Sequence, residues 1–234
     1  MKSPASLPVI FKLLVERGTI KSNLNKRKTM KFLFVLMTAF LINGVVSAQN
    51  INSPKGHINI GIKGGANFYN INNDNNVTYD SKIGFNVGLL GHIHVAKHFA
   101  LQPEIQYSAQ GAKYDFNNSI TKYNLGYINV PVLLQYMWDN GFRLQAGPQA
   151  GFLISAKSKN NDISVDIKDN YKPIDLGVSF GASYIHPSTG VGIDARYNLG
   201  LTDINENIEL KSTNRGLQMS LFYIFGHTSK NSQN

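Results

Sequence analysis

From residue 57 to residue 225 the chain alternates apolar and polar side chains with a period of two. In the segment 57–68, for example, Ile58 and Ile60 fall on one face and Asn59 falls on the other. Because successive side chains of a β-strand point to opposite faces, this pattern predicts half-buried strands. No helical periodicity of comparable length competes with the eight alternating segments, which are 57–68, 82–95, 99–110, 123–138, 142–155, 174–184, 191–201 and 217–225.

The connections between these segments alternate in length. Four are long and rich in Asn, Asp and Lys: 70–81, 112–122, 157–172 and 202–213. Three are short and carry residues typical of tight turns: 96–98, 139–141 and 186–190. Long loops at one rim and short turns at the other are typical of the smallest outer-membrane barrels. We therefore expect an all-β fold, an eight-stranded antiparallel transmembrane β-barrel with an up-and-down meander.

A soluble ligand-binding barrel of the lipocalin type is the alternative, because it also has eight alternating strands. The two classes differ in which face points outward. Here the polar face carries Gly, Ser, Asn and Gln together with charged residues of both signs. Such side chains suit a narrow polar lumen, whereas a lipocalin needs large apolar side chains inside. We therefore expect the apolar face to meet lipid.

The basic net charge of +9 is concentrated at the N-terminus. Residues 1–48 hold eight Lys or Arg and one acid, whereas residues 49–234 hold 15 basic and 13 acidic residues. The remainder of the chain thus carries only +2, and no nucleic-acid partner is expected. The absence of cysteine excludes a disulfide scaffold and cysteine-ligated metal sites.

A basic stretch, 26–31, leads directly into an uncharged apolar run, 32–46, which is followed by small residues up to Ala48. This pattern predicts a secretory signal peptide cut between Ala48 and Gln49, and the run is too short for a membrane-spanning helix. Both termini of an even-stranded barrel lie on the short-turn side, which we expect to be periplasmic, with the long loops extracellular. We therefore predict five segments. Residues 1–29 are an upstream extension or a long n-region, with Met30 as the alternative start, and residues 30–48 are the signal peptide. Residues 49–56 are a periplasmic lead-in, 57–225 the barrel domain and 226–234 a periplasmic tail.

Three segments carry a family resemblance. Residues 127–136 read YINVPVLLQY, residues 146–155 read AGPQAGFLIS and residues 195–204 read ARYNLGLTDI. In this order they resemble strands of the PorT-type outer-membrane β-barrel family of Bacteroidota (outer membrane protein beta-barrel domain). The resemblance covers 57–225 and implies a barrel in the outer membrane. Most members have no defined activity, and the name-giving member is tied to protein secretion and gliding. Asn129 departs from the family pattern, which usually has an acid there.

Charged residues on the polar face fall at similar depths. Counted from the short-turn ends of the strands, four of them lie four to six residues up and Arg143 lies lower. A charge buried alone in the lumen would cost several kcal/mol, so pairing is close to obligatory. We therefore predict an ion-pair cluster that blocks the lumen, made of Lys63, Glu104, Arg143, Asp194 and Arg196. A gate opened by rearrangement of these pairs is the alternative interpretation.

His92 and His94 share the lumen face and are weak metal-ligand candidates. No carboxylate or cysteine near them in sequence completes a set of four ligands, so we expect polar filling, and neither metal nor cofactor. All six histidines fall in the short-turn half or the tail: 57, 92, 94, 98, 186 and 227. An outward-facing site with a histidine base is therefore not expected, and we predict no catalytic residue and no enzyme activity.

The sequence thus predicts a monomeric, non-enzymatic outer-membrane barrel with a structural or interaction role in the cell envelope. Its expected partners are outer-membrane lipid, the barrel-assembly machinery during biogenesis, and envelope or secretion proteins. A narrow gated pore, or an accessory of an outer-membrane protein-secretion system, is the alternative.

Overall fold

The computed structural model describes residues 58–73, 79–116, 119–160, 163–206 and 211–226, which all lie in the compact unit 56–234. In these ranges no helix is both long and apolar enough to cross a membrane. The elements are β1 (Ile58–Asn73), β2 (Asp80–Ala96), β3 (Phe99–Phe116), β4 (Ser119–Met137), β5 (Phe142–Asn160), β6 (Ile163–Asp166), the 3-10 turn η1 (Lys168–Asn170), β7 (Ile174–Ile185), β8 (Val191–Gly200) and β9 (Ser212–Ile224).

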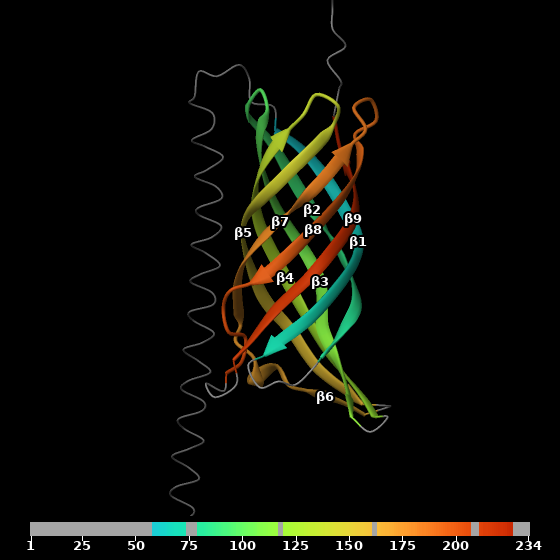
Figure 1. Cartoon of the computed structure of the whole chain (residues 1–234), viewed down its shortest axis with the longest axis vertical. Coiled ribbons are helices and arrows are strands. Elements are labelled where there is room, and N and C mark those ends of the chain that lie inside the picture. Colours follow the sequence, from blue (N-terminus) through green and yellow to red (C-terminus); the bar gives the residue numbers. More distant parts are fainter. Residues whose placement is uncertain (1–57, 74–78, 117–118, 161–162, 207–210, 227–234) are drawn as a thin grey trace, which may run out of the picture. The chain divides into compact units, whose positions relative to one another are not determined.

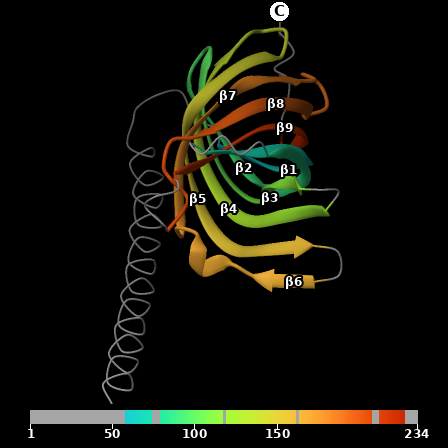
Figure 2. The ribbon, with the colours of Figure 1, turned by 60° about the horizontal axis from the view of Figure 1, so that its bottom comes forward.

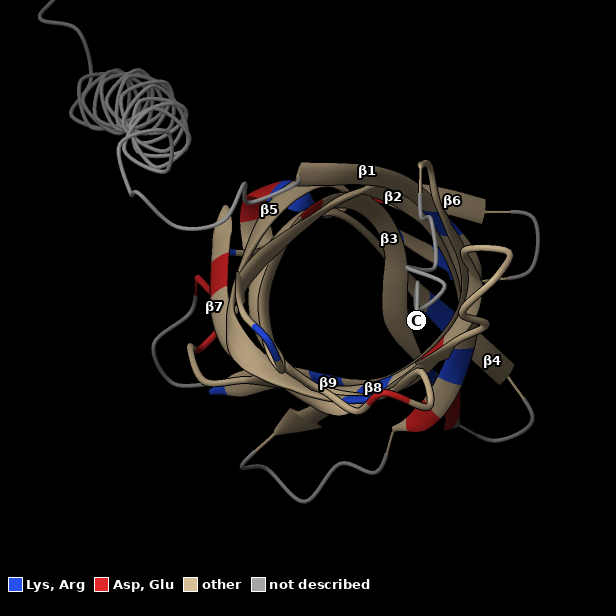
Figure 3. Cartoon of the chain, turned by 90° about the horizontal axis from the view of Figure 1, so that it is seen from above, with Lys and Arg blue, Asp and Glu red and all other residues tan. Residues whose placement is uncertain are grey.

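Eight of the strands form a closed antiparallel ring (Figures 1 and 3). Each ring strand pairs with its neighbours in sequence, except that β5 pairs with β7 because β6 stands outside the ring. The pairing of β1 with β9 closes the ring. The predicted eight-stranded meander is therefore confirmed.

The predicted long loops are shorter than expected, because several strands continue into them. Segment 112–122 is not a loop: β3 and β4 remain paired as far as Phe116 and Ser119. Within 157–172, β6 pairs with the end of β5, and Figure 2 shows the two side by side. These extensions escape the alternation rule because beyond the apolar band both faces of a strand can meet water, so neither face must be apolar.

The side chains that point away from the lumen are large and apolar. Ile83 is 67% exposed and Leu221 is 63% exposed, while polar and charged residues outnumber hydrophobic ones among the buried residues. A water-soluble barrel would show the reverse distribution. The soluble ligand-binding alternative is therefore wrong, and the apolar face is the one that suits lipid.

Aromatic rings gather on the outer face at the short-turn end. The ring centroids of Tyr136 and Trp138 are 4.6 Å apart, and those of Trp138 and Phe142 are 5.3 Å apart. Tyr223 and Phe225 form a further pair at 5.1 Å. Amphipathic rings at this level are typical of a membrane–water interface.

Candidate functional site: the filled lumen

Four charged side chains meet in the middle of the lumen. Lys63 Nζ lies 2.7 Å from Asp194 Oδ1 and 3.5 Å from Glu104 Oε1. Arg196 donates two parallel hydrogen bonds to Glu104, of 3.0 and 2.8 Å, and two more to Asp194, of 3.0 and 3.1 Å. All four side chains are at least 98% buried. We call Lys63, Glu104, Asp194 and Arg196 the central cluster; with two cations and two carboxylates it is electrically neutral.

The barrel brings these residues together from distant parts of the chain. Lys63 lies on β1, Glu104 on β3, and the Asp194–Arg196 pair on β8. The inward face has room for the long Arg196 side chain because its cross-strand neighbour is Gly181. A Cβ atom at Gly181 would lie 2.6 Å from Arg196 Cα. The glycines on the polar face thus admit the charged groups that fill the lumen.

A chain of glutamines completes the coordination of the carboxylates. Gln102 Nε2 donates to Glu104 Oε1 at 2.7 Å, and Gln145 Nε2 donates to Asp194 Oδ2. Gln135 Nε2 joins the two by donating to Gln102 Oε1 and Gln145 Oε1. Charge-assisted hydrogen bonds of this kind are stronger than neutral ones and hold the charged groups in place.

A neutral polar layer fills the lumen next to the cluster. Asn67 donates to Ser108, Asn86 donates to Asn67, and Ser220 donates to Asn86, each at 2.9–3.0 Å. Gln218 on β9 donates to Gln106 on β3 at 3.0 Å. These bonds cross between strands, so the polar side chains form a hydrogen-bonded core.

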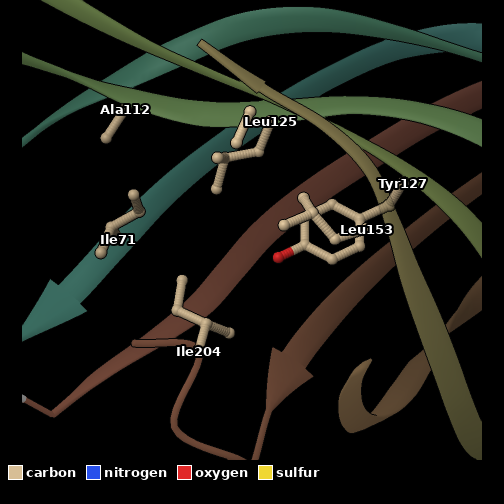
Figure 4. Packing of buried hydrophobic residues seen from close by; sticks show 7 residues of the cluster. Ile71, Ala112, Leu125, Tyr127, Leu153 and Ile204 are labelled. Carbon is tan, nitrogen blue, oxygen red and sulfur yellow. The ribbon is translucent and has the colours of Figure 1, made fainter. Parts of the chain in front are cut away.

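Two apolar clusters lie beyond the polar layers, one towards each rim. At the long-loop end Figure 4 shows buried side chains pointing toward one another: Ile71, Ala112, Leu125, Tyr127, Leu153 and Ile204. Ala156 belongs to the same cluster. At the short-turn end the cluster consists of Leu90, Ile185, Phe222 and Ile224. The sequence reasoning missed both clusters. Their only signal in the sequence was the apolar residues that fall on the polar face of the alternation, for example Phe222 and Ile224.

The loop after β8 folds inward and supplies Ile204. The Ile204 N–H donates to the carbonyl of Ser212 at 2.8 Å, and the Lys172 N–H donates to the carbonyl of Ile204 at 2.7 Å. Lys172 Nζ also forms a 2.7 Å ion pair with Asp203, which accepts hydrogen bonds from the N–H groups of Asn205 and Ser212. Burial acts to raise the pKa of Asp203, but the Lys172 bond and these N–H donors outweigh it and hold the pKa below its usual range. We call residues 201–206 the cap loop.

The structure does not bring every predicted site residue into the central cluster. Arg143 is buried lower in the lumen, and no carboxylate in the described part of the chain forms an ion pair with it. His92 is buried and His94 is exposed, with their ring centroids 4.6 Å apart. Among the described residues no group of three or more His, Cys, Asp or Glu could hold a metal ion. The predicted cleavage site, Ala48–Gln49, lies outside the described residues.

Comparison with known proteins gives a consistent result. Residues 47–206 match a family profile described as "Outer membrane protein beta-barrel domain". Among solved structures the chain is similar to Neisserial surface protein A (NspA), with 15% identity over 70% of this chain and 96% of that chain and a TM-score of 0.50. It is also similar to Ail, the attachment invasion locus protein of Yersinia pestis, with 15% identity over 73% of this chain and 100% of that chain and a TM-score of 0.42. No curated protein sequence matches. At such low identity the likeness to NspA shows a shared fold alone.

Proposed function

This chain belongs to the family of outer membrane protein beta-barrel domains, and we propose that it is a closed, non-enzymatic barrel with a structural or interaction role in the cell envelope. In this proposal the long loops face the outside, and the short turns and both termini face the periplasm, as is usual for such barrels. The barrel acts as a monomer, because the eight ring strands leave no edge to be paired with another copy and the strand outside the ring, β6, is only four residues long.

The observation that supports a closed barrel is the filling of the lumen. The neutral central cluster bridges β1, β3 and β8, so it ties opposite walls of the ring together. Apolar clusters beyond it, one towards each rim, add apolar side chains to the route that a hydrated ion would have to take. An ion would have to break buried ion pairs and cross apolar side chains, and both processes are costly.

Planar lipid-bilayer recordings test this proposal. Folded wild-type protein is expected to give little steady conductance. The double variant Glu104→Ala/Arg196→Ala is expected to give a higher conductance, because it removes two large side chains from the lumen, although the apolar clusters remain and limit the increase. Leu221→Ala, on the lipid-facing side, is the matched control and should remain closed. A large, steady conductance from folded wild-type protein would contradict the proposal and favour the gated-pore alternative.

The absence of enzyme activity is part of the proposal. Ser188 and His186 form a side-chain pair that resembles a nucleophile and base, with Oγ and Nδ1 atoms 3.1 Å apart in an exposed turn. Within the described residues no carboxylate contacts His186 to orient its ring, as a catalytic triad requires. Labelling with a fluorophosphonate tests this point, and a modified Ser188 would contradict it.

An accessory role in protein secretion is the second candidate, and the PorT-type segments favour it. The last of them, 195–204, ends in the cap loop, which is held against β7 because Thr202 Oγ1 donates to Asp175 at 3.1 Å. A partner could therefore recognise a defined loop surface. Chemical crosslinking in intact envelopes tests this role: reproducible crosslinks from the cap loop to a secretion component would support it, and crosslinks to lipid alone would count against it.

Export through a signal peptide at 30–48 completes the proposal. N-terminal sequencing of protein extracted from envelopes should begin at Gln49, and an uncleaved N-terminus would contradict it.

A further inference from the structure

Arg143 on β5 is a buried cation outside the central cluster. Its side chain points inward at the short-turn end, the residue is only 3% exposed, and its Nη1 has no hydrogen-bond partner in the described part of the chain. Directly across on β7 lies Ser183, which is 4% exposed and whose Oγ also has no partner there. Two adjacent buried polar groups without partners are unusual, since buried polar groups are normally hydrogen-bonded.

The central cluster does not neutralise Arg143. Ser183 is paired with Asp194, so the Cα atoms of Arg143 and Asp194 lie two strands apart, roughly 10 Å. Both oxygens of Asp194 already accept hydrogen bonds, from Lys63, Arg196 and Gln145. Glu104 is likewise held by both terminal nitrogens of Arg196. Arg143 is therefore a third cation beside a cluster that is already neutral.

A pocket of about 160 Å³ lies against Arg143 at the short-turn end. Lys97 and His94 also line it, and Met137 and Trp138 contribute apolar surface. Asp139 is the acid among its lining residues, but the Asp139 side chain is 88% exposed and lies 3.8 Å from His98. The pocket therefore presents a buried guanidinium and a lysine, and its acid is directed toward solvent.

We propose that this pocket binds a phosphate monoester group. A guanidinium offers two parallel N–H donors that match two phosphate oxygens, and Lys97 adds a second positive charge. A phosphate monoester carries between about 1.5 and 2 negative charges at neutral pH, so it compensates two cations better than a single carboxylate does. The apolar surface of Met137 and Trp138 would contact the carbon part of the ligand. The phosphate could belong to a soluble compound or to a lipid headgroup.

Trp138 is the only tryptophan of the chain and lines this pocket, so a change of its fluorescence that the pocket variants abolish reports on binding there. We would titrate the folded full chain, in a phosphate-free non-ionic detergent, with inorganic phosphate. In a second arm we would compare nanodiscs of phosphatidylcholine with nanodiscs that contain phosphatidic acid, whose headgroup is a phosphate monoester. A saturable change of Trp138 fluorescence with inorganic phosphate points to a soluble ligand. A fluorescence change only with phosphatidic acid points to a lipid headgroup. Either result supports the site.

The variants separate the pocket from general charge effects. Arg143→Gln is expected to weaken binding about tenfold or more, because it removes two charge-assisted hydrogen bonds. Arg215→Gln, an exposed arginine near the long-loop end of β9, is the matched control and should bind like wild type. A heat-modifiability gel verifies folding. If Arg143→Gln fails to fold, Lys97→Gln serves instead, since Lys97 is exposed, and it should weaken binding severalfold. No response in either arm, or equal binding by the folded pocket variants, would overturn the proposal.

Discussion

Replacement of Arg196 by Met tests whether the lumen charges stabilise the barrel as one unit. Arg196 is fully buried and donates four hydrogen bonds to two carboxylates. Arg196→Met leaves Lys63 as the only cation beside Glu104 and Asp194, so the buried cluster acquires a net charge of −1. Removal of one partner from a buried ion pair typically costs about 3–5 kcal/mol of unfolding free energy. Glu104→Gln leaves a net charge of +1 and should cost a similar amount.

The double variant distinguishes pairing from simple loss of packing. Glu104→Gln/Arg196→Met leaves Lys63 and Asp194, which lie 2.7 Å apart in the wild type, as an electrically neutral pair. If each single variant is destabilised by an uncompensated charge, the unfolding free energy of the double variant should fall by roughly as much as that of one single variant, or by less. If packing alone matters, the two losses should add.

Urea unfolding from detergent or vesicles, followed by the fluorescence of the single Trp138, measures these free energies. Trp138 suits this purpose because it lies on the outer aromatic face and leaves an apolar environment when the barrel unfolds. Leu221→Ala provides a control in which an exposed side chain is shortened without change of charge. Losses below about 1 kcal/mol for both single variants, or strictly additive losses, would refute the reasoning.

Three further predictions concern backbone contacts, the cap loop and pH. Gly65→Ala should prevent or strongly impair folding, because its Cβ would lie 2.0 Å from the Met219 carbonyl oxygen. Gly64→Ala should be tolerated, because the atom nearest to its Cβ would be 3.6 Å away. A heat-modifiability gel measures the folded fraction of both variants. Ile204→Ala should lower the unfolding free energy by about 2–5 kcal/mol in urea titrations, and equal stability would show that the cap loop does not pack as described. Asp203→Asn should lower the thermal midpoint at neutral pH, because a carboxyl with a lowered pKa stabilises the fold while it is ionised. The difference from wild type should begin to shrink as the pH falls below about 4, the ordinary carboxyl pKa, and vanish only below the lowered pKa of the folded state. A difference that did not shrink as the pH was lowered through the acid range would contradict this assignment.

The eight ring strands, the meander and the orientation of most strand side chains were predictable because they depend on local geometry. A period of two assigns each residue to a face without knowledge of its neighbours in space. Ile83 and Leu221 thus point outward and Gln106 inward, as the alternation requires. The strand ends beyond the apolar band were less predictable, since at 112–122 neither face of the β3–β4 hairpin must be apolar.

Depth along the strands predicted part of the candidate site. Lys63, Glu104, Asp194 and Arg196 were expected at one level, and they meet there. Arg143 was expected to join them, but it does not. A strand lies between Arg143 and Asp194, and other donors already occupy that carboxylate. Both facts follow from the strand pairing. Neither effect can be read from a single strand.

The sequence by itself therefore determined that this chain forms an eight-stranded barrel with an apolar exterior and a polar, charged interior, because alternation along a strand is a local property. Only the tertiary structure decided which interior groups are partners, for example Lys63 with Asp194, 131 residues further along the chain. It also decided that Ile204 folds inward to join the apolar cluster at the long-loop end. The physical reason is that closure of the ring sets the register between strands, and the register sets which side chains meet across the lumen.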